Sequence, residues 1–222
     1  MSAQAAMELR DGAPLAYRAI EPATPPTRLL ALLHGVGGNE TNLIPLGQEV
    51  TGDTLVVFPR APLVIGAGQF AWFPVRFGAD GPQIDFDEAM RSTHALQWFL
   101  RDLQARHGIP ASQSVIAGFS QGGIMSANVG LTAPDVVSGV GILSGRILPE
   151  IEPLVADAES LRTLDVLVVH GVQDNKLPPT WAQKADALLT RLDVPHATRL
   201  YPAGHEISAA MQRDFLSWLQ QK

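Results

Sequence analysis

Short apolar segments alternate with longer segments of helical periodicity along almost the whole chain. The short segments are rich in Val, Leu and Ile and end at Gly, Pro or polar residues, which is typical of buried strands. Strands that alternate with helices in this way favour an α/β protein with a mostly parallel sheet and crossover helices. The predicted strands are Leu15–Ile20 at an edge, Arg28–Leu33, Thr54–Phe58, Ser114–Gly118, Val136–Leu143, Asp165–His170 and His196–Tyr201, and the predicted helices are Asp87–His107, Gln121–Thr132, Trp181–Leu192 and Glu206–Gln220.

The segment from Arg60 to Asp85 is the one long stretch without clear periodicity. A segment of that kind in a compact domain is usually functional, often as a lid or a binding loop. No repeat, low-complexity tract or linker divides the sequence, so we predict a single domain over residues 1–222.

The composition narrows the class of protein. Of the 222 residues, 46% are hydrophobic and 17% charged, which suits a folded chain with a sizeable core. The net charge of -6 and the lack of a Lys/Arg cluster argue against a nucleic-acid binder. There is no cysteine, which excludes disulfides and thiolate chemistry. The first 18 residues do not resemble a secretory signal, and no apolar run is long enough to span a bilayer. We therefore predict a cytoplasmic protein without stable membrane insertion.

The sequence Gly118-Phe119-Ser120-Gln121-Gly122 fits the pattern G-x-S-x-G at the junction of a predicted strand and a predicted helix. A serine on such a turn is held in a strained backbone conformation, and the residues two before and two after it must be small. The alternative is a glycine-rich turn whose serine only caps the helix. The flanking pattern favours Ser120 as a nucleophile.

A serine hydroxyl is a poor nucleophile near neutral pH and needs a base to accept its proton. In this arrangement an acid and then a histidine follow the serine, each just beyond a strand. Asp174 comes four residues after the strand that ends at His170, and His205 follows the strand that ends at Tyr201. We predict Ser120, Asp174 and His205 as a catalytic triad, and His170 as a buried residue bonded to the backbone. The other histidines are weaker candidates: His94 and His107 lie on the long helix, and His196 begins a strand.

A glycine loop, Leu33–Gly38, follows the first buried strand. Such a loop can turn a backbone N–H toward the nucleophile. We predict an oxyanion hole made by the N–H of Val36 (or of Gly37) and the N–H of Gln121, the residue after the nucleophile. His34 is expected to stabilise the loop, and a direct role for it stays open.

Aromatic residues gather in the aperiodic segment, at Phe70, Trp72, Phe73 and Phe77. An apolar wall there would select acyl esters, because burial of each CH₂ of an acyl chain stabilises the complex by roughly 0.8 kcal/mol. We predict Phe70, Trp72 and Phe73 as substrate-binding residues. The alternative is that these rings only pack the loop against the core.

Together, these motifs resemble the phospholipase/carboxylesterase family, which includes carboxylesterases, lysophospholipases and acyl-protein thioesterases. The resemblance implies an α/β-hydrolase fold with helices on both faces of the sheet and no large cap domain. It also implies hydrolysis of esters or thioesters without a metal or cofactor. The motifs that carry it are Leu33–Gly38, Arg60-Ala61-Pro62, Trp72-Phe73, Gly118–Gly123, Leu143-Ser144-Gly145, His170–Asp174 and Gly204-His205.

The predicted function is that of a serine carboxylesterase, which hydrolyses a small-molecule acyl ester through an acyl-enzyme intermediate. Two alternatives stay open. The first is a thioesterase or lysophospholipase that uses the same triad, and the second is a non-catalytic binder on a hydrolase scaffold. The oligomeric state is also open, with a homodimer among the alternatives.

Overall fold

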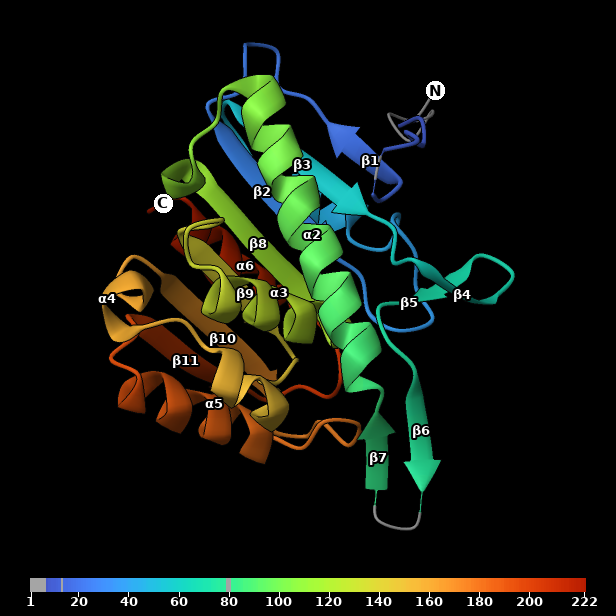
Figure 1. Cartoon of the computed structure of the whole chain (residues 1–222), viewed down its shortest axis with the longest axis vertical. Helices are drawn as coiled ribbons and strands as arrows, with labels where there is room; N and C mark the ends of the chain where they lie inside the picture. The colour runs from blue at the N-terminus through green and yellow to red at the C-terminus, as the bar shows by residue number, and fades with distance from the viewer. Residues whose placement is uncertain (1–6, 13, 79–80) are drawn as a thin grey trace.

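A seven-stranded sheet forms the centre of the protein in the computed structural model, which describes residues 7–12, 14–78 and 81–222 except for the side chains of 76–78 and 81–82. The strand order is β1-β3-β2-β8-β9-β10-β11 (Figure 1). All neighbours pair in parallel except the edge strand β1, which runs antiparallel to β3. The predicted mostly parallel sheet is confirmed. The strands are β1 (Tyr17–Ile20), β2 (Arg28–Leu33), β3 (Thr54–Pro59), β8 (Ser114–Phe119), β9 (Gly139–Leu143), β10 (Asp165–Gly171) and β11 (His196–Tyr201).

Parallel pairing brings the carboxyl ends of the central strands to one edge of the sheet. β2 pairs with β8 from Leu29 opposite Ser114 to Leu33 opposite Gly118, and β8 continues beside β9 to Phe119 opposite Leu143. The loops that follow β2, β8, β9, β10 and β11 therefore leave from the same side. Functional side chains of an open α/β sheet lie at this edge.

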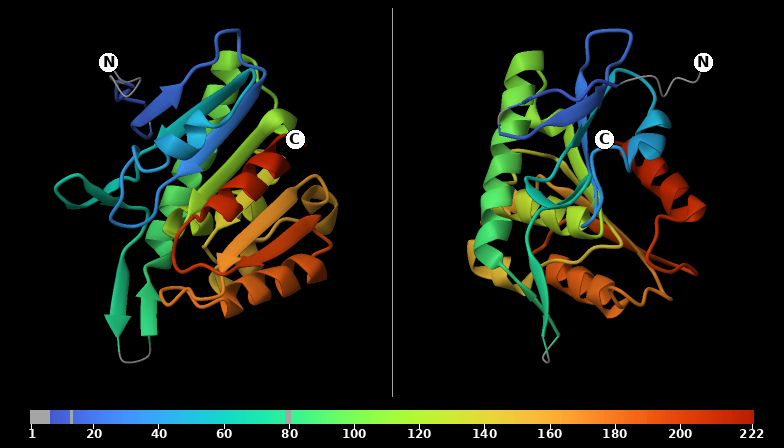
Figure 2. Two further views of the ribbon diagram at one scale, coloured as in Figure 1. Left: turned by 180° about the vertical axis from the view of Figure 1, so that it is seen from behind. Right: turned by 90° about the vertical axis from the view of Figure 1, so that its right-hand side faces the viewer.

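Helices cover both faces of the sheet, as Figure 2 shows in its edge-on view. On one face, α2 (Phe86–His107), α3 (Gln121–Thr132), α4 (Ala158–Leu161) and α5 (Thr180–Arg191) contribute to one apolar core. On the other face, α1 (Ile44–Gln48) and α6 (Ala209–Leu219) close a second core. Two short 3₁₀ helices, η1 (Ala111–Gln113) and η2 (Pro149–Leu154), lie in the connections.

Local signals set the helix ends. The side chain of Asp85 accepts the N–H of Glu88 and begins α2, and Gly108 ends that helix in the left-handed conformation, with φ 67°. The last helix begins at Ala209 and not at the predicted Glu206, because Ser208 caps it by accepting the N–H of Met211. β9 likewise begins three residues later than predicted, since a turn joins the N–H of Val136 to the carbonyl of Ala133.

The aperiodic segment contains two β-hairpins that the sequence did not predict. The first pairs β4 (Leu63–Gly66) with β5 (Gln69–Ala71), and the second pairs β6 (Val75–Gly78) with β7 (Gly81–Ile84). Both lie outside the main sheet, and the second extends well away from it (Figure 1). Strands of three or four residues are too short to show a clear two-residue period.

Candidate active site

Ser120 lies on a sharp turn between β8 and α3. Its backbone has φ 55° and ψ -116°, a conformation that L-residues rarely adopt. The turn is tight, because a Cβ at Gly118 would lie 2.4 Å from the carbonyl carbon of Gly122, and one at Gly122 would lie 2.2 Å from the carbonyl oxygen of Leu33. The serine side chain makes no capping hydrogen bond to α3, so the helix-cap alternative is not supported.

The structure brings Ser120, His205 and Asp174 together, although the chain separates them widely. Nε2 of His205 lies 2.9 Å from Oγ of Ser120, and Nδ1 of His205 lies 2.7 Å from Oδ2 of Asp174. The three residues follow β8, β11 and β10, whose carboxyl ends share one edge of the sheet. A carboxylate can only accept, so Nδ1 of His205 carries the proton and Nε2 is free to accept the serine proton.

The carboxylate of Asp174 is buried and receives hydrogen bonds at both oxygens. Oδ1 accepts the backbone N–H groups of Lys176 and Leu177, at 2.8 and 2.9 Å. Burial by itself would raise the pKa of Asp174, but the hydrogen bonds from His205, Leu177 and Lys176 outweigh it and lower that pKa. Asp174 is therefore held as an anion that orients the imidazole of His205.

His170 is buried beneath this pair, as predicted. Its Nε2 lies 2.8 Å from the carbonyl oxygen of Leu177 and 3.3 Å from Oδ2 of Asp174. Both neighbours accept, so Nε2 carries the proton and donates to them. Within the described residues, Nδ1 of His170 has no partner.

Two backbone N–H groups beside Ser120 are free to bind an oxyanion. Among the described residues, no hydrogen-bond acceptor lies opposite the N–H of Val36 or of Gln121. The N–H of Gly37, the other candidate, is occupied by the carbonyl of Phe70 at 2.9 Å. The glycine loop lies close to Ser120, because a Cβ at Gly35 would be 3.3 Å from Cβ of Ser120.

His34 holds the glycine loop in place. Its Nε2 accepts the N–H of Ala61 at 3.1 Å, and its Nδ1 lies 2.8 Å from the carbonyl oxygen of Gly35. Burial lowers the pKa of His34, which favours the neutral ring that this pattern requires. With both nitrogens occupied, His34 has no free atom to serve as a base.

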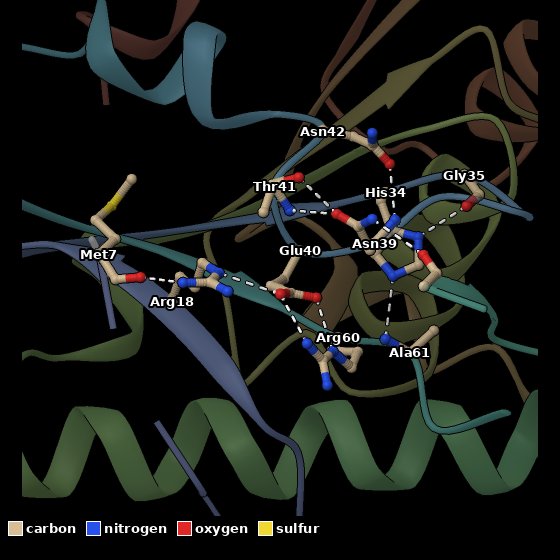
Figure 3. A network of polar contacts seen from close by, with 11 residues as sticks. Met7, Arg18, His34, Gly35, Asn39, Glu40, Thr41, Asn42, Arg60 and Ala61 are labelled. Carbon is tan, nitrogen blue, oxygen red and sulfur yellow. Dashed lines mark hydrogen bonds and ion pairs between the residues drawn. The ribbon is translucent and has the colours of Figure 1, made fainter. Parts of the chain in front are cut away.

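A buried ion pair anchors the chain just after the glycine loop (Figure 3). Both carboxylate oxygens of Glu40 accept from Arg60, at 2.7 and 2.8 Å, and one also accepts Nε of Arg18 at 3.1 Å. Burial alone would raise the pKa of Glu40, but the two arginines lower it to about 2. Asn39 adds a local turn by accepting both the N–H and the hydroxyl of Thr41.

The predicted substrate wall requires a correction, since Trp72 and Phe73 are both 0% exposed. Nε1 of Trp72 donates to the carbonyl of His34 at 3.0 Å, and the side-chain amide of Gln121 bonds to the backbone of Trp72 and Phe73, at 2.8 Å each. Side chains with no exposed surface do not contact a ligand in this conformation. Phe70 is partly buried and lies under the guanidinium of Arg60, 4.6 Å from the ring centroid. The side chain of Phe77 lies outside the described residues.

A cleft of about 470 Å³ opens beside His205 instead. It lies between the glycine loop with α1 on one side and the segment from His205 into α6 on the other. Apolar side chains dominate its lining. The polar side chains that line it are His34, Asn42, His205, Glu206 and Gln212. The apolar lining residues include Val36, Leu43, Pro45, Leu46, Phe119 and Ile207.

The described residues contain no group of three or more His, Cys, Asp or Glu side chains placed to hold a metal ion. None of the helices in the described parts of the chain has the length and apolar character needed to cross a membrane.

Comparison with known proteins decides the family. The sequence matches the phospholipase/carboxylesterase family over residues 16–222. The chain belongs to this family. It is 30% identical over 184 residues to acyl-protein thioesterase 1 of Mycosarcoma maydis, covering 72% of this chain and 74% of the relative. It is 27% identical over 205 residues to a probable SOBER1-like carboxylesterase of Arabidopsis thaliana, covering 86% and 77%.

Solved structures agree with this assignment. The crystal structure of esterase PE8 matches with a TM-score of 0.84 and 27% identity, over 93% of this chain and 98% of that one. A carboxylesterase from Mesorhizobium loti shares the fold, with a TM-score of 0.82 and 23% identity over 97% and 99%. The predicted α/β-hydrolase fold and the family resemblance are confirmed, and the protein is a hydrolase that acts on ester bonds.

The sequence did not predict three contacts at this site. The side chain of Gln121 bonds to the backbone of Trp72 and Phe73, the buried His170 also contacts Asp174, and Glu40 anchors the chain after the glycine loop. Glu40 lies between two polar residues, Asn39 and Thr41, and this local pattern gives no sign of burial. Charged residues are rarely buried without a partner, and the partners of Glu40 are about 20 residues away in the sequence. The contact of His170 with Asp174 could have been predicted, since His170 lies four residues before Asp174 at the end of a strand.

Proposed function

We propose that this esterase is a serine carboxylesterase that cleaves acyl esters in two steps, with Ser120, His205 and Asp174 as its triad. The observation that carries the proposal is the unbroken contact from Oγ of Ser120 through the imidazole to Asp174, at 2.9 and 2.7 Å. These lengths are within hydrogen-bond range, so a proton can pass from the hydroxyl to Nε2.

In the first step Oγ of Ser120 attacks the ester carbonyl carbon while its proton moves to Nε2 of His205. Asp174 stabilises the resulting imidazolium, and the N–H groups of Val36 and Gln121 bind the oxyanion. The alcohol then leaves with the proton from His205, and Ser120 keeps the acyl group. Water, activated by the same histidine, attacks the acyl-enzyme and releases the acid.

Substitution of the nucleophile tests the proposal. Ser120→Ala should lower kcat by about 10⁴-fold or more on a short aryl ester, with an unchanged melting temperature. Ser126→Ala, six residues further along the chain in α3, is the control, since the one hydrogen bond of its side chain within the described residues goes to the carbonyl oxygen of Gly122. A fluorophosphonate probe should label the wild type and not Ser120→Ala. A variant that keeps a tenth of the wild-type rate would exclude Ser120 as the nucleophile, and an unlabelled, inactive wild type would favour the non-catalytic binder.

A thioester substrate is the second candidate, because relatives at up to 30% identity are named acyl-protein thioesterases. The same triad serves both substrates, since a thiolate leaves at least as readily as an alcohol. A matched pair of oxygen ester and thioester with the same acyl chain would separate them by kcat/KM. The cytoplasmic location, the single domain and the homodimer stay predictions.

A further inference from the structure

Arg146 is a buried cation without a counter-ion at the edge of the sheet that carries the triad. It is 8% exposed and follows β9, whose carboxyl end lies beside Ser120. No carboxylate of the described residues lies within 4.0 Å of it, whereas Arg18, Arg60 and Arg101 each have one. Burial lowers the pKa of Arg146, and the charge of Glu150 only partly opposes that shift. A guanidinium stays charged in proteins, so its burial without an anion destabilises the unliganded fold.

The side chain is held in one orientation by stacking. The guanidinium carbon lies 4.3 Å from the ring centroid of Trp181, the second residue of α5. The ammonium of Lys184 lies 4.4 Å from the same centroid, and it too has no carboxylate partner among the described residues. Two cations on one indole, neither with a carboxylate within 4.0 Å among the described residues, make a positive site in a protein of net charge -6.

The hydrogen-bonding capacity of Arg146 is unused. Its Nε is enclosed and has no acceptor within the described part of the chain. The terminal nitrogens make no hydrogen bond there either, but they are not fully enclosed and so remain open to a ligand. Buried polar groups are normally satisfied, so an orphaned guanidinium points to a partner that arrives with the ligand.

The backbone just before Arg146 lies close to Ser120. Gly145, the residue before Arg146, packs on the turn that holds Ser120, because a Cβ at Gly145 would lie 3.0 Å from the carbonyl oxygen of Ser120. Ser144 donates from Oγ to the carbonyl oxygen of Glu206, the neighbour of His205, at 3.0 Å. Trp181 begins the helix that follows the Asp174 loop. The apolar cleft lies toward α1 and α6, so Arg146 is on the side of Ser120 toward α5.

We propose that Arg146, oriented by Trp181 and assisted by Lys184, binds a free carboxylate on the substrate, so that this enzyme prefers esters that carry a second, unesterified acid group. The proposal rests on the proposed esterase function. Of the acyl part and the alcohol part of the ester, one would occupy the apolar cleft, and the other would carry the free carboxylate that binds Arg146. A planar guanidinium matches a carboxylate in geometry and can bind it through two hydrogen bonds.

Paired substrates that carry a distal acid group either free or as its methyl ester test this proposal. The acyl-side pair is 4-nitrophenyl hydrogen adipate and 4-nitrophenyl methyl adipate, and the alcohol-side pair is 4-acetoxybenzoate and its methyl ester. In one pair the wild type should show a kcat/KM at least roughly tenfold higher for the anion, and added salt should reduce that ratio. Arg146→Met should abolish the preference while leaving the neutral ester within about twofold, and Arg146→Lys should retain part of it. Arg162→Met, at an exposed arginine paired with Asp193, should change neither substrate.

Equal or lower kcat/KM for the anion in both pairs of the wild type would overturn the proposal without any variant. Equal losses on charged and neutral esters in Arg146→Met, with a lower melting temperature, would assign Arg146 a packing role and overturn it too. Failure of the wild type to hydrolyse any of the four esters would instead overturn the proposed function. Adipate binding to the wild type but not to Arg146→Met, measured by calorimetry, would in that case still support the carboxylate site.

Discussion

Nε2 of His170 lies 3.3 Å from Oδ2 of Asp174, the same oxygen that contacts Nδ1 of His205 at 2.7 Å. Two imidazoles therefore approach one carboxylate oxygen, one from the solvent side and one from the core. His170 also donates to the carbonyl oxygen of Leu177, whose N–H donates to Oδ1 of Asp174. His170 thus ties together both ends of the loop that positions the acid.

We expect His170→Phe to lower kcat by about tenfold with little change in KM, because Asp174 loses one donor and part of its orientation. His170→Asn, which restores a side-chain N–H, should recover part of the loss. His94→Asn, at an exposed histidine of α2, is the matched control. Steady-state kinetics and the pH profile of kcat report the effect. Unchanged kcat in His170→Phe, at an unchanged melting temperature, would show that the contact of His170 with Asp174 does not contribute to catalysis.

Trp72→Ala should reduce stability and leave acyl-chain preference unaltered, since the indole has no exposed surface. Removal of a buried tryptophan costs about 3–5 kcal/mol, which for a chain of this size lowers the melting temperature by roughly 10 °C. Trp98→Ala, at an exposed tryptophan of α2, should have little effect. The measurements are thermal unfolding and kcat/KM on acetate, butyrate and octanoate esters. A selective loss of kcat/KM on the octanoate ester, without a lower melting temperature, would show that Trp72 contacts the acyl chain of the substrate.

Glu40→Gln should destabilise the protein by about 2–3 kcal/mol at pH 7, because it breaks a buried ion pair with Arg18 and Arg60. The pKa of Glu40 is depressed to about 2, so its contribution is present above the usual value of 4.5 and is lost as the pH falls toward 2. The difference between wild type and variant in the free energy of unfolding, from urea titrations, should therefore shrink across that range. Glu152→Gln, in an exposed pair with Arg191, should cost less than about 1 kcal/mol. A difference that does not depend on pH would contradict the assigned pKa.

Val36→Pro should lower kcat by about 10²–10³-fold, because proline lacks the N–H that we assign to the oxyanion hole. Val36→Ala is the control, since the valine side chain is largely exposed and the N–H is retained. Melting temperatures check that the loop has kept its fold. Similar kcat in the two variants would show that the N–H of Val36 does not bind the oxyanion.

The sequence by itself determined the order and type of most elements. The strands of the main sheet and the longer helices have signals of their own, namely a short apolar run, a helical period, or a boundary residue such as Gly108 after α2. The strands of the two hairpins have none. The strained turn at Ser120 could also be predicted from the sequence. The turn requires glycine at positions 118 and 122, and both lie within five consecutive residues of the sequence. The loops after β10 and β11 could be expected at the same edge as Ser120, since parallel strands place their carboxyl ends together.

Only the tertiary structure decided which side chains these loops bury and which they expose. Trp72 and Phe73 lie in the core, where the side chain of Gln121, 49 and 48 residues away, bonds to their backbone. Arg146 meets Trp181, 35 residues away, and Glu40 meets Arg18 and Arg60, 22 and 20 residues away. Such contacts leave no local pattern, because an aromatic or charged residue in an aperiodic loop has the same neighbours in sequence whether it packs inward or faces a ligand. Burial at these positions depends on strand order and crossover packing, which set the partners only once the whole sheet has formed.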